Sequence, residues 1–195
     1  MVVNYNNITV IGNDLPCGIY VLLITVLSDL DLAFGRFKKG KVIHLPRSEY
    51  VYTGSALGKK GSTCLARRLV RHATRTSDRM PHQIRPNMLD FFSSIRLATG
   101  EFIPRTAKTL YWNIDHLLNR TEVEIKGLAC LRIDDPLEAR IGKQLELRPD
   151  TNIIEKGLGA NDIKGNTHLL RFADSQKNWP SLIDSLVQTW SAHSH

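Results

Sequence analysis

The stretch GIYVLLITV, from Gly18 to Val26, anchors the fold that we predict. Nearly all of its residues are β-branched, aromatic or aliphatic, which is typical of a buried strand. A second such run, YVYT at residues 50–53, follows a turn at Pro46 and predicts a neighbouring strand. Tyr50 and Tyr52 are two residues apart, so their side chains share one face of that strand. These two runs are predicted as main strands of a β-sheet.

Weaker signals extend the sheet and place helices between its strands. Further strands are expected at residues 41–45, 122–133 and 166–172, and helices at about 62–74, 88–97, 110–118, 136–147 and 179–190. Pro136 is expected at the first position of its helix. The pattern predicts an α/β or α+β fold, with a small, mixed, mainly antiparallel central sheet of three or more strands flanked by helices.

A chain of 195 residues favours one domain. We expect a leader or short edge element at residues 1–15, a domain at 16–172 with an insertion at 76–108, and a C-terminal helical segment at 173–195. No apolar run approaches the ~20 residues of a membrane span, and no signal peptide is recognisable. The three cysteines lie far apart without a CxxC pair. These features predict a cytoplasmic protein with reduced thiols and no membrane partner.

Basic residues are concentrated in one part of the chain. Its formal net charge is +7, from 26 Lys and Arg against 19 Asp and Glu. Between Lys59 and Arg85 stand eight basic residues and a single acidic one, Asp78, so this segment alone carries an excess of seven positive charges. Such a block predicts a phosphate-rich partner, with a solvated basic face as the ordinary structural alternative.

Several basic side chains fall on the helix expected at residues 62–74. Arg67, Arg71 and Arg75 recur every four residues, and Arg68 and His72 form a second pair with this spacing. Each like-charge pair costs an isolated helix roughly 0.2–0.5 kcal/mol, which makes the run unusual. Arg68 and His72 adjoin the apolar side, from which they can point into a cleft, with snorkelling at the core edge as the alternative.

Two further groups have the chemistry to meet a phosphate or a metal ion. The loop at residues 54–61 contains Lys59 and Lys60 between glycines, without the spacing of a Walker A motif. In the helix after Pro136, Glu138 stands one turn before Gly142. A carboxylate facing a gap left by glycine suits Mg²⁺, which often takes only one or two carboxylates and keeps its waters. Favourable placement of an acid in a first helical turn is the alternative.

The order of these motifs resembles the GIY-YIG nuclease superfamily. GIY stands at residues 18–20, YTG at 52–54, RLVRH at 68–72, and the acid is Glu138. The longer sequence motifs resemble one branch of this superfamily, whose members are small, prokaryotic and mostly uncharacterised. Three motifs carry that resemblance: YVYTGSA at 50–56, WNID at 112–115, and a late glycine-rich element that begins at Gly157.

The resemblance, which runs from about Pro16 to Phe172, implies an endonuclease that hydrolyses DNA phosphodiester bonds with Mg²⁺ or Mn²⁺. It implies that Glu138 holds the metal and that Arg68 stabilises charge on the phosphorus. It also implies that Tyr20 positions or deprotonates the attacking water, that Tyr52 assists, and that His72 accepts a proton from one of them. It adds as further site residues Tyr50, Lys60, Asn152, Asp162 and His168. The residues expected to bind nucleic acid are Lys59, Lys60, Arg67, Arg71 and Arg75.

The chain departs from that branch at several positions. Tyr111 and Asn113 flank the tryptophan where the branch has histidines, and Ile163 and Gly165 replace cysteines. A non-catalytic nucleic-acid-binding module is therefore kept as the alternative function, and RNA as an alternative substrate. Because one active site cuts one strand, duplex cleavage would need a homodimer or two encounters, with the helix at 179–190 as the expected contact surface.

Overall fold

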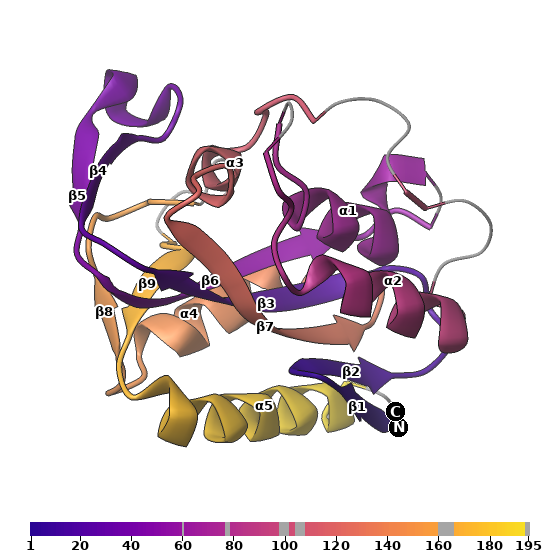
Figure 1. Ribbon diagram of the computed structural model, residues 1–195. Helices are drawn as coiled ribbons and strands as arrows, with labels where there is room; N and C mark the ends of the chain where they lie inside the picture. The colour runs from indigo at the N-terminus through magenta and orange to yellow at the C-terminus, as the bar shows by residue number, and fades with distance from the viewer. Residues whose placement is uncertain (60, 77–78, 98–101, 104–107, 160–165, 194–195) are drawn as a thin grey trace.

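The computed structural model describes residues 1–59, 61–76, 79–97, 102–103, 108–159 and 166–193. Within these residues, seven strands form a central sheet in the order β1-β2-β7-β3-β6-β9-β8, and β4 and β5 form a separate hairpin (Figure 1). The strands are β1 (Val2–Tyr5), β2 (Ile8–Gly12), β3 (Gly18–Val26), β4 (Leu30–Ala33), β5 (Val42–Leu45), β6 (Ser48–Ala56), β7 (Val123–Arg132), β8 (Thr151–Ile153) and β9 (Leu169–Phe172). The helices are α1 (Leu65–His72), α2 (Arg85–Ser94), α3 (Asn113–Leu118), α4 (Glu138–Glu146) and α5 (Ser175–Ser191), with 3₁₀ turns η1 (Phe37–Gly40) and η2 (Gly61–Thr63).

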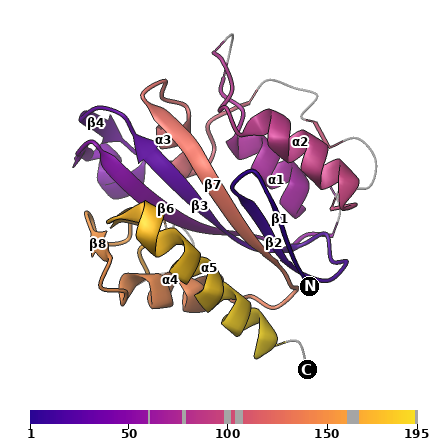
Figure 2. The same cartoon turned by 60° about the horizontal axis from the view of Figure 1, so that its bottom comes forward.

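The strand β3, which the sequence predicts as a buried strand, lies at the centre of the sheet. It pairs antiparallel with β6 on one side and β7 on the other along its whole length. Alternate side chains enter two separate hydrophobic clusters. Tyr20 and Leu22 pack into the cluster that α1, α2 and α3 cover, and Ile19 and Val21 into the one that α4 and α5 cover. The mainly antiparallel sheet with helices on both faces (Figure 2) confirms the predicted fold class.

The N-terminal segment, predicted as a leader or short edge element, contains a hairpin that extends the sheet. In the β1–β2 turn, Asn6 and Asn7 have φ values of 42° and 65°. This two-residue, left-handed turn suits the twist of a hairpin and tolerates asparagine. All five residues of β2 are buried, and β2 pairs parallel with β7. The segment is thus part of the core rather than an appendage.

Two helix starts differ from the sequence prediction. Pro136 was expected at the first position of its helix, but α4 begins at Glu138, with Leu137 as its N-cap. The helix α1 begins at Leu65 after Cys64, whose backbone is extended, and not at residue 62 or 63. Both shifts leave the buried faces where the apolar spacing predicts them, with Leu65, Leu69 and Ile141 in the core.

The helix α5 packs along the sheet face that it shares with α4 (Figure 2). Leu182 and Leu186 are buried against β2 and β7. The apolar stripe that we expected to serve as a contact surface between copies is therefore covered by the chain itself, because the core needs it. Among the described residues, no helix combines the length and the apolar character that crossing a membrane requires.

Candidate active site

The site begins with Tyr20, which stands on β3 directly opposite Gly54 of β6. A Cβ atom at position 54 would collide with the hydroxyl and the ring of Tyr20. Glycine at this position therefore makes room for the Tyr20 side chain to lie across the neighbouring strand. Tyr20 and Tyr52 share this face, with their ring centroids 6.3 Å apart. The YTG motif thus supplies one tyrosine and the space for another.

His72 joins Tyr20 from the last turn of α1. Its Nε2 lies 2.8 Å from the Tyr20 hydroxyl oxygen, and its side chain is 1 % exposed. Burial lowers the pKa of His72 to about 4, so the ring is neutral at neutral pH. Its Nδ1 lies 3.7 Å from a carboxylate oxygen of Asp115. A proton on Nδ1 would face that carboxylate, which leaves Nε2 to accept a hydrogen bond from the Tyr20 hydroxyl.

Neither tyrosine is a phenolate at neutral pH. Burial raises the pKa of Tyr20 and of Tyr52 well above the ordinary value, by more than the nearby Arg68 cation lowers it. Even an unperturbed tyrosine, with a pKa of about 10, is roughly 3 units from ionising at pH 7. Tyr20 can take a proton from water only by releasing its own proton, and His72 is the acceptor that touches it.

Asp115, which is fully buried in α3, binds the surrounding donors. It accepts two hydrogen bonds of 3.0 Å from Arg71, and its Oδ1 lies 3.5 Å from the ammonium nitrogen of Lys108. The backbone N–H groups of Tyr111 and Trp112 donate to it at 2.9 Å. Burial alone would raise its pKa, but the hydrogen bonds and cations outweigh burial and hold the pKa far below its usual range. Asp115 thereby fixes the indole-bearing segment beside α1.

Arg68 lies over that indole ring. Its guanidinium carbon is 3.9 Å from the Trp112 ring centroid, and that of Arg71 is 4.4 Å away. Arg71 is neutralised by Asp115, whereas the guanidinium of Arg68 makes no hydrogen bond or ion pair with any residue that the structure describes. In the part of the chain that the structure describes, the buried Nε of Arg68 has no hydrogen-bond partner. An arginine is always charged, so this one is held ready for an anion.

The acidic residue of the site is Glu138, the first residue of α4. Its Oε1 lies 3.2 Å from Nδ1 of His168, and the Ser55 hydroxyl donates to its other oxygen. Burial alone raises the pKa of Glu138, but the hydrogen bonds from His168 and Ser55 and the charge of Arg68 outweigh burial and lower the pKa. The carboxylate is therefore ionised at neutral pH, and its side chain is 21 % exposed.

The gap that Gly142 leaves is filled by a side chain. A Cβ atom at position 142 would lie 3.2 Å from Cδ2 of His168, so glycine allows α4 to approach the buried imidazole. The expectation that this gap holds a metal ion is corrected accordingly, because His168 occupies it and points its Nδ1 at Glu138. Gly159, with φ at +85°, also lies against His168 and Tyr52, which brings the late glycine-rich element to the site.

Other predicted site residues lie elsewhere. The Tyr50 hydroxyl donates to the carbonyl of Pro46 at 2.7 Å, which ties it to the turn before β6. Asn152 is exposed on β8, opposite Arg171 and away from the other candidates. Lys60 and Asp162 lie outside the described residues.

The predicted basic face of α1 needs a correction at Arg75. This side chain is buried and donates to backbone carbonyls and to Glu124, so it cannot meet a nucleic acid. Arg71 is mostly committed to Asp115, and Arg67 is half-buried. Lys59 is exposed, with its ammonium nitrogen 3.5 Å from a carboxylate oxygen of Asp134. The helical spacing identified the arginines but did not separate the buried one from the rest.

Sequence reasoning missed three contributors to the site: Asp115, Trp112 and Ser55. Asp115 and Trp112 belong to the WNID motif, where an acid three residues after an N-cap can accept the cap's N–H group. This spacing is a helix-start signal that the sequence analysis did not use, and it does not indicate the arginine and histidine that gather around Asp115. Ser55 follows the YTG motif directly, and its partner Glu138 is 83 residues away in the sequence.

The donor set at Glu138 fits a metal ion that keeps most of its waters. No group of three or more His, Cys, Asp or Glu side chains is gathered for a metal among the residues described by the structure. A single ionised and partly exposed carboxylate suits Mg²⁺, which is commonly bound by one or two carboxylates together with waters and substrate phosphates. The residues present are thus compatible with Mg²⁺ or Mn²⁺ at Glu138, with Ser55 and His168 orienting the carboxylate.

The chain belongs to the family described as "Domain of unknown function DUF123", whose model matches residues 19–190. This match corrects the membership in the GIY-YIG superfamily that the motif order predicted, because it assigns nearly the whole chain to a distinct family. Tripeptides such as GIY and YTG are also ordinary strand sequences, so their order alone was too short a signal. No curated protein and no solved structure matches the chain.

Proposed function

We propose that this protein is a divalent-metal-dependent endonuclease that hydrolyses DNA phosphodiester bonds at the site around Tyr20, Arg68 and Glu138. One observation carries the proposal. The buried side-chain atoms that lack a hydrogen-bond partner, within the described part of the chain, belong to Thr53, Arg68, His72 and His168. Arg68, His72 and His168 belong to this site, and Thr53 adjoins it, because its backbone N–H group donates to the His168 carbonyl at 3.0 Å. Buried polar atoms are nearly always satisfied, so a group of exceptions in one place supports a ligand-binding or catalytic role.

Arg68 is the proposed phosphate ligand. Its cation is held on the Trp112 ring and is not neutralised by any carboxylate among the described residues. Arginine forms strong, directional hydrogen bonds to phosphate oxygens. In hydrolysis, negative charge grows on the oxygens of the five-coordinate phosphorus, and a preorganised guanidinium stabilises this charge more than that of the ground state.

Tyr20 and His72 are the proposed path for the proton. The water oxygen attacks phosphorus, the water proton passes to the Tyr20 hydroxyl oxygen, and the hydroxyl proton of Tyr20 passes to Nε2 of His72. The imidazolium that forms lies beside the Asp115 carboxylate, which favours it electrostatically. The bond from phosphorus to the 3′-oxygen breaks, and that oxygen takes a proton from solvent. Tyr52 packs beside Tyr20 and restricts its position.

Glu138 is the proposed metal ligand. A Mg²⁺ or Mn²⁺ ion bound there would act as a Lewis acid toward the leaving oxygen. The chain's own contribution is to keep this carboxylate ionised and oriented, through Ser55 and His168. The lowered pKa of Glu138 keeps the ligand charged throughout the neutral range.

DNA is the proposed substrate because of the charge of the chain. A formal net charge of +7, concentrated between residues 59 and 85, favours association with a polyanion. We also propose a cytoplasmic location, consistent with the free, buried thiols of Cys17, Cys64 and Cys130.

A plasmid-nicking assay at low salt tests the proposal. Wild-type protein is compared in Mg²⁺, in Mn²⁺ and in EDTA, together with the variants Glu138→Gln and Glu122→Gln. Glu122 is a partly exposed carboxylate paired with Arg120, and its replacement makes the same change of charge away from the site. We expect nicking in either metal, none in EDTA, loss of nicking in Glu138→Gln and full activity in Glu122→Gln.

DNA binding is measured in parallel on the same proteins. Retained binding by Glu138→Gln would show that the carboxylate serves the chemical step. If wild-type protein binds plasmid, branched and single-stranded DNA but cleaves none of them in either metal, the endonuclease proposal is wrong. A non-catalytic nucleic-acid-binding module would then be the better description.

A further inference from the structure

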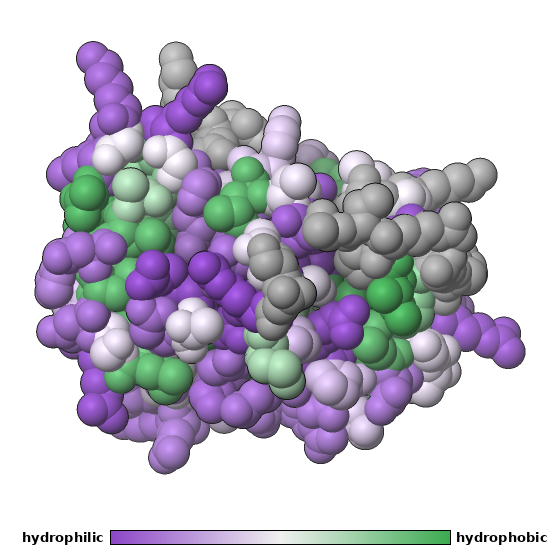
Figure 3. All heavy atoms as spheres, turned by 45° about the horizontal axis from the view of Figure 1, so that its top comes forward, coloured by the Kyte–Doolittle hydropathy of each residue, from purple (hydrophilic) through white to green (hydrophobic). Residues whose placement is uncertain are grey.

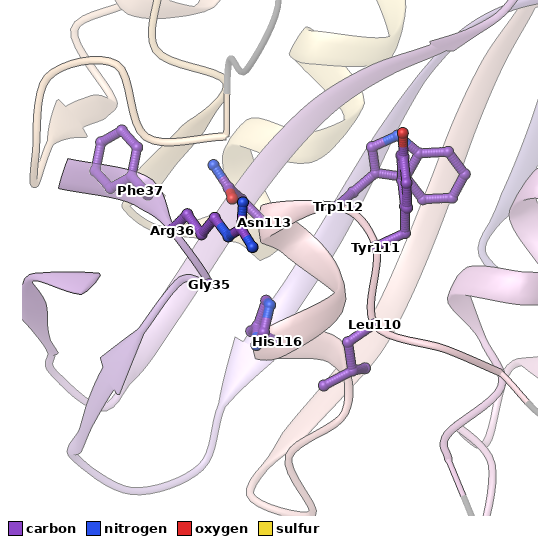
Figure 4. Close-up of a pocket in the computed structure, with 8 residues that line it drawn as sticks. All are labelled: Gly35, Arg36, Phe37, Leu110, Tyr111, Trp112, Asn113 and His116. Atoms are coloured by element: carbon purple, nitrogen blue, oxygen red, sulfur yellow. The ribbon is translucent and has the colours of Figure 1, made fainter. Parts of the chain in front are cut away.

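A pocket of about 770 Å³ lies beside the candidate active site. Figure 4 shows that it is lined from two directions, by η1 with the residues before it and by the start of α3 with the segment that leads into it. Its lining residues are Gly35, Arg36, Phe37, Leu110, Tyr111, Trp112, Asn113 and His116. We call it the α3 pocket. Its volume is within the ~300–1,000 Å³ typical of small-molecule sites.

The α3 pocket and the active site share Trp112. This residue lines the pocket and also supports the Arg68 guanidinium, 3.9 Å from its ring centroid. A phosphate bound by Arg68 would therefore lie near the rim of the pocket. The neighbouring nucleotide of the same strand is within reach, because successive phosphates in a strand are only a few ångströms apart.

The pocket offers both an aromatic surface and an unpaired cation. Tyr111 is 77 % exposed and stands edge-on to Trp112, with ring centroids 5.3 Å apart. Arg36 extends toward Asn113 in Figure 4, and its side chain makes no hydrogen bond or ion pair with a described residue. Phe37 closes the other end. Aromatic faces stack bases without regard to sequence, and guanidinium groups bind phosphates, so the lining suits a nucleotide.

The shape of the pocket is built into the fold. Gly35 has φ at +58°, and a Cβ atom there would lie 2.8 Å from Nε2 of His116. Glycine therefore lets η1 turn close to α3 and leaves the half-buried imidazole facing the pocket. Seen from the side of α3 and the β4–β5 hairpin, strongly hydrophilic residues cross the middle of the surface between two hydrophobic patches (Figure 3).

We propose that the α3 pocket receives one unstacked DNA nucleotide next to the scissile phosphate, with its base on Tyr111 and its own phosphate on Arg36. This inference rests on the proposed function and names its substrate as DNA that is single-stranded or frayed at the cleavage position. A base-paired nucleotide is stacked within the duplex and cannot enter a pocket formed by side chains from two segments, so the protein should prefer unpaired strands.

Binding without metal tests this inference separately from cleavage. Fluorescence anisotropy in EDTA at about 0.1 M salt compares a labelled DNA strand of about 12 nucleotides with a duplex of the same sequence. The variants are Tyr111→Ala and Arg36→Ala. The matched controls are Tyr5→Ala, an exposed tyrosine on β1, and Arg47→Ala, an exposed arginine in the turn before β6.

We expect wild-type protein to bind the single strand more tightly than the duplex. Tyr111→Ala and Arg36→Ala should each weaken binding of the strand about tenfold and change duplex binding by less than about twofold. Both controls should match wild type. Because Tyr111 and Arg36 are exposed, neither variant threatens the fold.

The inference is wrong if Tyr111→Ala binds the strand as tightly as Tyr5→Ala does. A matched RNA strand that binds more tightly than the DNA strand would overturn the choice of DNA. Strand binding that depends on Tyr111, in a protein that nicks no DNA with either metal, would keep the pocket assignment and overturn only the proposed function. If Tyr111→Ala and Arg36→Ala nick DNA at the wild-type rate, the proposed function would be kept and the pocket assignment overturned.

Discussion

Two clusters at the end of α1 contain similar residues and differ in how their polar atoms are satisfied. In the first, Arg75 donates to three backbone carbonyls and pairs with Glu124 at 2.8 Å. His82 in the same cluster uses both ring nitrogens, because Nε2 lies 2.8 Å from the Leu118 carbonyl and the Ile125 N–H group donates to Nδ1. The second cluster contains Arg68 and His72, which lie on α1 itself.

In this second cluster the donors and acceptors are not matched. Arg68 has no hydrogen-bond partner among the described residues, and a ring nitrogen of His72 also lacks one. Leaving a buried polar group unpaired costs about 1–3 kcal/mol. A fold that fully satisfies one arginine–histidine cluster and leaves its neighbour unsatisfied has placed the second where a ligand can complete it. Both clusters contain an arginine and a histidine, so residue type alone does not distinguish them. Hydrogen bonding separates the structural cluster from the candidate site.

The largest expected effect contrasts the two arginines in stability. Arg75→Ala should lower the free energy of unfolding by about 3–5 kcal/mol, because it removes the cation that pairs with Glu124 and leaves several buried carbonyls without their donor. Arg68→Ala should change it by less than about 1 kcal/mol, since only the contact with the Trp112 ring is lost. Urea denaturation of both variants measures the difference. Equal destabilisation would show that Arg68 is a structural residue as well.

The second prediction separates His72 from the other titratable groups by the pH dependence of the free energy of unfolding. In the unfolded chain His72 takes a proton near pH 6.5, whereas burial lowers its pKa in the folded protein to about 4. Between these values the unfolded state binds more protons, so stability falls as the pH is lowered from 6.5 toward 4. The loss from this group approaches about 3 kcal/mol.

The variant His72→Gln isolates that contribution. Burial also lowers the pKa of His82, which adds a loss in the same direction. The free energy of unfolding is measured against pH for both proteins. Subtracting the curve of His72→Gln from that of wild type removes the contribution of His82 and of the other groups that both proteins contain. The difference should shrink as the pH falls from 7 to 4. Parallel curves would mean that His72 is not a buried neutral base.

The third prediction contrasts two tyrosine hydroxyls on the same sheet face. Tyr20→Phe should reduce the nicking rate about 100-fold, because the proton path from water to His72 is broken. Tyr50→Phe removes a hydrogen bond to the Pro46 carbonyl and should leave the rate unchanged. Each variant should lose about 1 kcal/mol of stability. Rates measured on supercoiled plasmid decide the matter, and a Tyr20→Phe protein with wild-type activity would remove Tyr20 from the mechanism.

The smallest expected effect concerns the support of Glu138. In Gly142→Ala the new methyl group lies 3.2 Å from His168, which should shift the imidazole and reduce nicking several-fold. Helix propensity favours alanine over glycine by about 1 kcal/mol, so stability should hardly change. Gly127→Ala in β7 meets only ordinary contacts and is the control. Unchanged nicking in Gly142→Ala would show that the position of His168 does not matter.

The two central strands were predicted from the sequence more clearly than the edge strands. The unbroken apolar run of β3 and the tyrosine-rich β6 are typical of strands with both faces buried. The β1–β2 hairpin was missed because the asparagine-rich start was interpreted as a leader or a short edge element. The pair Asn6–Asn7 between two apolar stretches was a hairpin signal, since both residues tolerate positive φ.

The site was predicted in its residues but not in its connections. Tyr20, Arg68, His72 and Glu138 were named from motifs, and the structure brings them together. Asp115 was not predicted as a site residue, and His168 was predicted as one but not as the partner of Glu138. Both contact the site residues across long sequence separations. Hydrophobic periodicity reports which face of an element is buried, and it does not report which buried acid meets which buried base.

The most direct test of the central claim is chemical rescue of nicking by free methylguanidinium. Arg68→Ala should lose at least about 100-fold in rate, and millimolar methylguanidinium should restore part of it by occupying the space above Trp112. Arg75→Ala, assayed at a temperature where it is folded, should nick at the wild-type rate per folded molecule and gain nothing from the additive. Wild-type nicking by Arg68→Ala, or equal loss and equal rescue in both variants, would contradict the assignment of the unsatisfied cluster as the active site.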